Sequence, residues 1–250
     1  KIIDNVSVLG GWATVDKIVA TLTVKFPGIS SVHSYVKMPD GSANTAVGGA
    51  VDERTWKNEE TSLAILKGTY DLVVVKGAKQ KIVDAVDCNS DSCTVDGIVA
   101  KLTVNFPGIS SVHSYVKVDD SVVGTAAGGS VDERTWKTNS TSLAVLKGSY
   151  DVIVVKGAKQ LIADAVNCTG DICSVDNIIS TLTVNFPGIS SVHSYVKTDN
   201  GVDGTATGGA VDERTWKTDS TSMVLLKGTY DVVVVKGAQT KVVDSVNCTD

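Results

Sequence analysis

The sequence predicts an all-β protein of three tandem small antiparallel β-sandwich domains, each of about 80 residues. One observation is a gapless internal repeat: "FPGISSVHSYVK" stands at Phe26–Lys37, Phe106–Lys117 and Phe186–Lys197. A second is that apolar residues alternate with polar ones within each copy, as in half-buried strands. A third is the length of the repeat, which suits a self-contained domain, whereas three blades are too few for a propeller. The predicted domains are 1–88, with an extra strand at 1–6, then 89–168 and 169–250.

The predicted elements of one domain are taken from the second copy. In the first strand, Ile98, Ala100, Leu102, Val104 and Phe106 share one face. Pro107-Gly108 predicts a turn after it, and 156–159 predicts a hairpin turn between the last two strands. The polar, Gly-rich stretch 119–129 differs most among the copies and predicts a loop. The predicted strands, in order, are 98–106, 112–118, 143–146, 150–155 and 161–166.

Composition excludes two classes of protein. The 250 residues are 42% apolar and 20% charged, with a net charge of −5, which argues against a general nucleic-acid binder. No window of about 18 uninterrupted apolar residues occurs, so we expect no membrane span. The chain starts at Lys1, which is typical of a processed end or of a piece of a longer chain.

Four cysteines form two "C-x4-C" pairs at the junctions between copies: Cys88 with Cys93, and Cys168 with Cys173. The equivalent residues near the N-terminus are Val8 and Ala13, so both cysteines of that pair are absent together. Joint absence favours a disulfide over a zinc site, which would need four ligands. We therefore expect local disulfides that stiffen the junctions, and an oxidising, extracellular compartment.

The fifth cysteine, Cys248, has no partner five residues further on. Such a residue predicts an intermolecular bond, a free thiol or sequence beyond the given end.

One strand occurs four times although the rest of the unit occurs three times. "KIIDNV" at Lys1–Val6 matches segments that begin at Lys81, Leu161 and Lys241. The surplus copy is either a boundary effect or a strand that pairs with a neighbouring molecule, giving a head-to-tail polymer of the chain with itself. The candidate assembly residues are Lys1, Ile2, Ile3, Val6, Lys241, Val242, Val243 and Val246.

Two segments, "SSVHSYVK" and "VDERTWK", stay unchanged in all three copies and predict a repeated contact surface. Their aromatic residues could stack on sugars, or the tryptophan could instead cap a small core. A hydrolase would need a nucleophile beside the histidine, and no G-x-S-x-G motif is present, so we expect no enzyme. The candidate surface residues are His33, Tyr35, Trp56, His113, Tyr115, Trp136, His193, Tyr195 and Trp216.

Other short motifs are less specific. A calcium ion near Asp119-Asp120 or Asp199-Asn200 is an alternative to the expectation of no cofactor, but the EF-hand spacing is absent. The N-x-S/T pattern predicts candidate glycosylation sites, of which Asn139 lies in the most polar segment. These sites are Asn5, Asn139, Asn167 and Asn247.

A family resemblance covers about the last third of each unit. The segment "LKGTYDVVVVKGA" at Leu226 resembles the "L-x-x-G-x-Y-x-V-x-V" strand of carboxypeptidase-regulatory-like and Cna-B-like (prealbumin-like) β-sandwiches. The resemblance implies a fold, and a location on a prokaryotic surface, where such domains are often strung together. Cna-B-like domains often carry a Lys–Asn isopeptide bond. Lys101 is in the first strand here, but its counterparts are Thr21 and Thr181, which departs from that pattern.

Together these features lead us to expect a structural extracellular repeat protein. It would be a filament subunit, pilus-like or fibre-like, or a surface stalk. The alternative is a multivalent adhesin that binds cell-surface glycans through the repeated Trp, His and Tyr surface.

Overall fold

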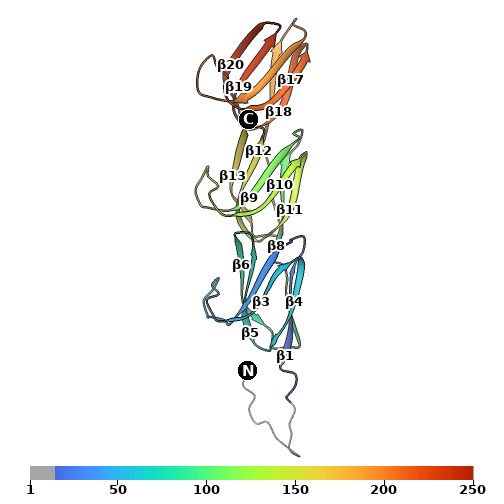
Figure 1. Cartoon of the computed structure of the whole chain (residues 1–250), viewed down its shortest axis with the longest axis vertical. Helices are drawn as coiled ribbons and strands as arrows, with labels where there is room; N and C mark the ends of the chain where they lie inside the picture. The colour runs from blue at the N-terminus through green and yellow to red at the C-terminus, as the bar shows by residue number, and fades with distance from the viewer. Residues whose placement is uncertain (1–14, 250) are drawn as a thin grey trace, which may run out of the picture. The chain divides into compact units, whose positions relative to one another are not determined.

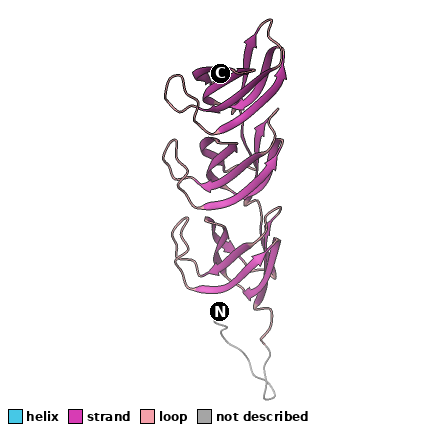
Figure 2. Ribbon diagram, turned by 45° about the horizontal axis from the view of Figure 1, so that its top comes forward, coloured by secondary structure: helices cyan, strands magenta, loops and turns pink. Residues whose placement is uncertain are grey.

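The computed structural model describes residues 15–249, and the fold that it shows in them is all-β. Its strands and loops are drawn in Figure 2. Among the described residues there is no helix that could cross a membrane. The predicted fold class, tandem β-sandwiches, is confirmed.

The strands of the three repeats follow one another in the same order, and Figure 1 colours them along the chain. The first repeat contains β1 (Val19–Phe26), β2 (Val32–Lys37), β3 (Ala50–Lys57), β4 (Glu59–Leu66), β5 (Thr69–Lys76), β6 (Lys79–Asp87) and β7 (Ser92–Val95). The middle repeat contains β8 (Val99–Phe106), β9 (Val112–Val118), β10 (Ser130–Lys137), β11 (Asn139–Leu146), β12 (Gly148–Lys156), β13 (Lys159–Cys168) and β14 (Ile172–Val175). The third repeat contains β15 (Ile179–Phe186), β16 (Val192–Thr198), β17 (Ala210–Lys217), β18 (Asp219–Leu226), β19 (Gly228–Lys236) and β20 (Gln239–Cys248).

Each repeat has two sheets. The larger sheet has four strands, in the order β3-β2-β5-β6, β10-β9-β12-β13 and β17-β16-β19-β20. The smaller sheet has three strands in the first two repeats, β4-β1-β7 and β11-β8-β14, but only β15-β18 in the third. The third repeat therefore differs from the others at one sheet edge, beside β15.

The described chain divides into two compact units, and their boundary passes through the middle repeat. Among the described residues, unit 1 comprises 15–102, Leu143–Ser149 and Asn167–Cys173, and unit 2 comprises Thr103–Ser142, Tyr150–Val166 and 174–249. The predicted domain bounds at 88 and 168 stay predictions. The predicted boundary at residue 88 assigns β7 to the second domain, although β7 pairs with β1 in a sheet of the first repeat.

The apolar alternation in the sequence is what places the core. In β1, Ala20, Leu22, Val24 and Phe26 are buried on one face, and the residues between them are exposed or half-buried. These side chains meet Leu72 and Val74 from the opposite sheet in one apolar cluster within unit 1. Burying such a face is the main favourable term in the folding of a sandwich of this size.

A buried aspartate in each repeat fixes a loop and a β-bulge whose positions the apolar alternation of the sequence does not determine. In the third repeat, the carboxylate of Asp231 accepts hydrogen bonds from the backbone N–H groups of Ser245, at 3.2 Å, and Asn200, at 3.0 Å. Ser245 has a positive φ of 51° next to a register shift between β19 and β20. Asp71 and Asp151 hold the same two positions in their own repeats. The carboxylate thus ties a β-bulge to the start of a long loop.

Replacing Asp231 with alanine should therefore lower the free energy of unfolding of the third repeat by roughly 2–4 kcal/mol, because two backbone donors lose a charged acceptor. Urea unfolding followed by tryptophan fluorescence measures the change. The matched control is Asp203→Ala, since Asp203 is exposed in the loop of the same repeat. Equal stability of the two variants would contradict the structural role of Asp231.

Candidate functional site

The two invariant segments lie side by side in the larger sheet of each repeat. β2 carries His33 and Tyr35, and its antiparallel neighbour β3 carries Trp56. The rings of His33 and Trp56 lie edge to face, with centroids 4.4 Å apart and an interplanar angle of 77°. The other two copies reproduce the centroid distance of 4.4 Å, with angles of 75° and 76°. Each repeat therefore presents the same aromatic pair.

The tryptophan of each pair is exposed. The exposed fractions are 71% for Trp56, 72% for Trp136 and 72% for Trp216. The interpretation that tryptophan caps the core is therefore wrong. The core space is filled instead by Phe26 and by the tyrosine of β5, Tyr70.

All three tryptophans have left-handed backbone conformations, with φ of 54°, 53° and 53°. In the middle repeat, the register between β9 and β10 shifts between Arg134 and Lys137, which brackets Trp136. A left-handed conformation costs an L-residue roughly 1–2 kcal/mol, and a bulge turns a side chain away from the direction of the regular strand. Strain of this kind, repeated at three equivalent exposed aromatic residues, is typical of functional surfaces.

Polar groups surround the aromatic pair. The Tyr35 hydroxyl lies 3.5 Å from His33 Nδ1, and the corresponding distance between Tyr195 and His193 is 3.4 Å. Arg54 and Asp52 of β3 form an ion pair at 2.8 Å, but they stand opposite the buried Ser34 and Val36 and so belong to the other face of the sheet. An exposed indole with an adjacent hydroxyl and imidazole suits a ligand with both an apolar face and hydroxyl groups. The tryptophan–histidine surface is defined here as His33, Tyr35 and Trp56 with their two sets of counterparts.

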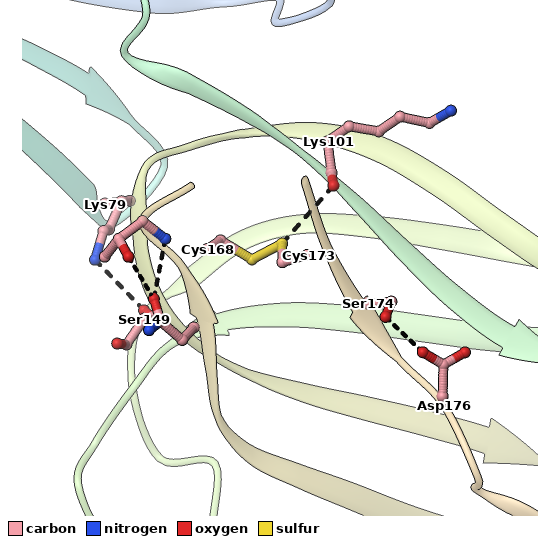
Figure 3. Close-up of a disulfide and its surroundings, with 9 residues drawn as sticks. Lys79, Lys101, Ser149, Cys168, Cys173, Ser174 and Asp176 are labelled. Carbon is pink, nitrogen blue, oxygen red and sulfur yellow. Dashed lines mark hydrogen bonds between the residues drawn. A yellow bond between two sulfur atoms is a disulfide. The ribbon is translucent and has the colours of Figure 1, made fainter. Parts of the chain in front are cut away.

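The cysteine pairs form disulfides in the structure. Cys88 is bonded to Cys93, and Cys168 to Cys173, each with Cα atoms 5.1 Å apart. Figure 3 shows the second pair, with Cys173 beside the backbone carbonyl of Lys101. Cys93 lies in β7, whereas Cys88 directly follows β6 of the opposite sheet. Each disulfide therefore links the two sheets of one sandwich.

The first repeat is closed by a parallel strand pair. β7 runs parallel to β1, with Leu22 opposite Cys93 and Val24 opposite Val95. The backbone N–H of Thr21 donates to Asp91 O at 2.9 Å, just before β7. The Asp91 carboxylate accepts a hydrogen bond from Lys67 Nζ, and this contact holds the pKa of Asp91 below its ordinary value. β1 and β7, the first and last strands of the repeat, are therefore direct neighbours in its smaller sheet.

Cys248 is the counterpart of Cys88 and Cys168, and it is a buried free thiol in this structure. Burial raises the pKa of the thiol. A raised pKa lowers the fraction of the thiol that is present as thiolate, the reactive form.

One group of acids could hold a metal ion. The carboxylates of Asp119, Asp120 and Asp151 lie within 4.8 Å of one another, the one such group found among the described residues. The Asp120 carboxylate already accepts hydrogen bonds from the backbone N–H groups of Val122 and Ala127. These donors occupy oxygens that a calcium ion would need. At the other candidate, Asp199-Asn200, the backbone N–H of Asn200 donates to Asp231, the counterpart of Asp151, and the Asn200 amide stands where the middle repeat has the Asp120 carboxylate.

The same loop contacts make two of the repeats sensitive to acid. Hydrogen bonds from Val47 N–H and Ala127 N–H hold the pKa values of Asp40 and Asp120 below the ordinary range. Because these pKa values are lower in the folded state, the stabilisation is full above the ordinary pKa and is lost as the pH falls through the folded value. In the third repeat, Asn200 replaces this acid and donates to Thr207.

An acid titration from about pH 5 to about pH 2, followed by NMR, should therefore move the amide resonances of Val47 and Ala127. The Thr207 amide provides an internal control and should stay in place, because Asn200 does not titrate. Equal movement at all three amides would contradict this account of the loops.

The remaining candidate residues are placed as follows. Asn139, Asn167 and Asn247 are exposed, and the Asn139 side-chain oxygen accepts from the Gly108 backbone at 2.9 Å. Lys241–Val246 lies in β20, which is paired with β19 on one side and forms the edge of its sheet. It therefore offers an edge rather than a free strand. Lys1–Val6 and Asn5 lie outside the described residues, and the glycosylation and assembly roles stay predictions.

Comparison with known proteins gives no family for the chain. No family model matches it, and no curated protein matches it. Among solved structures, it is similar to the Bacillus anthracis TIE protein, at 8% identity and a TM-score of 0.23, over 92% of this chain and 49% of that one. It is also similar to the tip fimbrial protein Mfa3 from Porphyromonas gingivalis, at 10% identity and a TM-score of 0.29, over 80% of this chain and 99% of that one. The chain thus spans about half the length of the first protein, and both TM-scores are too low to carry an argument.

Proposed function

We propose that the chain is a structural extracellular protein, a surface stalk or filament subunit, whose repeats carry tension. The observation that carries the proposal is the parallel pairing of β1 with β7, closed by the Cys88–Cys93 disulfide. The proposed role is not enzymatic.

The direction of the two strands decides how the first repeat responds to a pull on its ends. Force enters at the start of β1 and leaves at the end of β7. Because the strands run parallel, the pull slides one along the other, and the hydrogen bonds between them are loaded together rather than one after another. Strand pairs loaded in this way resist separation better than pairs that open from one end.

The disulfide gives the force a second path. Cys93 in β7 is bonded covalently to Cys88, which follows β6 of the larger sheet. If β7 slides from β1, the load passes through the disulfide to that sheet. Only residues 96–98 connect β7 to β8, and only residues 176–178 connect β14 to β15. The linkers between the repeats are therefore short and can extend little under load. Disulfides also favour an oxidising compartment outside the cell.

As a filament subunit, the chain would assemble head to tail with copies of itself. Support comes from β20, which contains the candidate assembly residues Lys241–Val246 and lies at the edge of its four-stranded sheet. An unpaired edge is a template for strand addition from another chain, and a heterologous contact that does not close on itself yields a filament.

Single-molecule force spectroscopy of the whole oxidised chain tests the load-bearing role. We expect two unfolding events at high force, from the disulfide-closed repeats, and one at lower force, from the third repeat. Cys88→Ser with Cys93→Ser should lower one of the two high-force events and leave the other unchanged as an internal control. Three equally weak events in the oxidised chain would overturn the proposal.

A second candidate function is the binding of cell-surface glycans by the tryptophan–histidine surface. The specific observation in its favour is that three strained tryptophans are exposed beside polar groups. Three equal sites on one chain would add avidity to weak single-site binding. This role is compatible with a stalk, and its test is described in the Discussion.

A further inference from the structure

The larger sheet of the third repeat is hollowed on the face that points away from the core. The apolar lining of this hollow comes from Val233 and Val235 of β19, Val242 of β20 and Ala206 of the long loop before β17. Its volume is about 430 Å³, and it is open to solvent. A hollow of this size suits a small organic ligand. We call it the valine hollow.

The place of the third repeat in the chain does not account for this open face. Each of the other two repeats is followed by another repeat, yet the same face stays open in both. The counterparts of Tyr195, Lys197 and Val235 in those repeats are half-buried, as these three residues are. The counterparts of Thr240 are exposed, as Thr240 is. What distinguishes the third repeat is therefore the set of side chains on this face.

Two side chains of β20 are smaller than their counterparts and widen the hollow. Thr240 stands where the other repeats have Gln80 and Gln160, and Val242 stands where they have Ile82 and Ile162. Val242 is opposite Val233 in the register of β19 and β20. Val233 is half-buried, whereas its counterparts in the first and middle repeats are only 5% and 8% exposed. The smaller residues thus leave apolar surface uncovered.

A lysine beside the hollow has lost the partner that its counterparts have. Lys37 Nζ donates to Ala46 O at 2.5 Å, and Lys117 Nζ donates to Ala126 O at 2.7 Å. Both bonds tie the lysine to the long loop. Lys197 lines the valine hollow, and among the described residues it forms neither this hydrogen bond nor an ion pair. Its ammonium group is therefore available to a ligand.

The third repeat also lacks the loop carboxylate that lies near this lysine elsewhere. Hydrogen bonds from the N–H groups of Val47 and Ala127 are the main cause of the lowered pKa values of Asp40 and Asp120. The charge of the neighbouring lysine lowers the same pKa values further. Asn200 stands at this position in the third repeat, so the lysine there has lost a neighbouring anion.

Two other carboxylates near Lys197 do not replace that anion. Asp231 stands opposite Lys197 in the pairing of β16 and β19, but its oxygens accept the two backbone hydrogen bonds described above. Glu213 stands opposite Tyr195 on β17, on the side of β16 that is away from the hollow. A cation therefore borders an apolar hollow, and no carboxylate is committed to it.

From these features we propose that the valine hollow of the third repeat binds a small organic carboxylate with an apolar body. Lys197 pairs with the carboxylate, and the apolar body covers the valines that larger side chains cover in the other repeats. The carboxylate is that of a free organic acid or of an acidic sugar, since Tyr195 belongs both to this hollow and to the tryptophan–histidine surface. The inference goes beyond the load-bearing role and does not depend on it.

NMR titration of the whole oxidised chain with cyclohexanecarboxylate at neutral pH tests the site. We expect saturable shifts of the amide resonances of Lys197, Val233 and Thr240. The corresponding amides of the first and middle repeats are internal controls and should stay in place. Cyclohexanecarboxamide has nearly the same shape without the charge, and it should bind more weakly by at least about tenfold.

Variants of the lining residues separate a site from non-specific contact. Lys197→Met removes the charge and keeps the length of the side chain, and it should weaken binding by at least about tenfold. Thr240→Gln combined with Val242→Ile restores the residues of the other repeats and should weaken binding by filling the hollow. The matched control is Lys217→Met, since Lys217 is exposed in β17 of the same repeat. Circular dichroism checks that each variant is folded.

A second probe distinguishes the two sources of the carboxylate. If the source is an acidic sugar, N-acetylneuraminic acid should displace cyclohexanecarboxylate and also shift the indole resonance of Trp216. If the source is a free organic acid, only cyclohexanecarboxylate should bind, and the Trp216 indole resonance should stay in place. Absence of binding by both probes, equal shifts in all three repeats, equal affinity for the acid and the amide, or unchanged binding in Lys197→Met would each overturn the inference.

Discussion

Replacing Phe26 with alanine should lower the free energy of unfolding by roughly 3–5 kcal/mol, the largest stability change that we expect from a single substitution in the first repeat. Phe26 is completely buried at the end of β1, where it packs in the cluster that also contains Ile29 and Leu146. Removing the ring deletes apolar contacts and leaves a cavity that a sandwich of two rigid sheets cannot readily close.

Urea unfolding of the whole oxidised chain measures this loss, and the first repeat should unfold before the others. The matched control is Lys25→Ala, since Lys25 is the preceding residue of β1 and its side chain is exposed on the opposite face. We expect that variant to change stability by less than about 0.5 kcal/mol. A similar loss in both variants would mean that the alternation of β1 does not place Phe26 in the core.

The part of the fold that follows from the sequence is the part set by apolar alternation. The face of β8 formed by Ala100, Leu102 and Val104 is buried as predicted. β10 has no such alternation, because most of its residues are exposed or half-buried, and it was not among the predicted strands. Apolar patterning identifies a strand only where one of its faces packs against a core.

Long-range pairing was the second feature that the sequence could not provide. The apolar pattern gives no reason for β7, which contains the second cysteine of the first pair, to return to the sheet of β1. A four-residue strand carries too little alternation to show its partner, and parallel pairing depends on the path of the whole repeat. The spacing of Cys88 and Cys93 indicated a local bond but not that this bond joins two sheets.

The direction in which the Trp56 side chain points could not be predicted either, because it depends on the local backbone geometry. Regular alternation assigns a residue to a face of the sheet, but a bulge with a left-handed residue breaks that assignment. The three-fold recurrence of "VDERTWK" did indicate a repeated surface, since these segments stayed constant while the loop at Asp119 changed. Nothing in the sequence indicated the left-handed backbone conformation of these tryptophans, because tryptophan is an unusual residue at a positive φ.

Replacing Trp56, Trp136 and Trp216 together should separate the function of this surface from its contribution to the fold. If the surface binds glycans, the triple alanine variant should lose binding by at least about a hundredfold, because both the stacking contacts and the avidity of three sites disappear. A glycan array probed with the whole chain measures this loss.

The stability of the same variant should change little. Each substitution removes an edge-to-face contact with histidine, worth about 0.5–1.5 kcal/mol, but also removes an exposed apolar ring. Glycine at the same positions should relieve the left-handed strain, so the triple glycine variant should be at least as stable as the triple alanine variant.

The single variants provide the internal control for this experiment. If each site binds independently, Trp56→Ala should leave two working sites and reduce avidity only in part, and Trp136→Ala and Trp216→Ala should behave alike.

Binding that survives in the triple variant would remove the adhesin role. A triple alanine variant that unfolds would instead show that the exposed rings stabilise the sheet, and the strain at Trp56 would then need a structural explanation. Retained stability with lost binding would explain why three repeats keep a costly backbone conformation at an exposed residue.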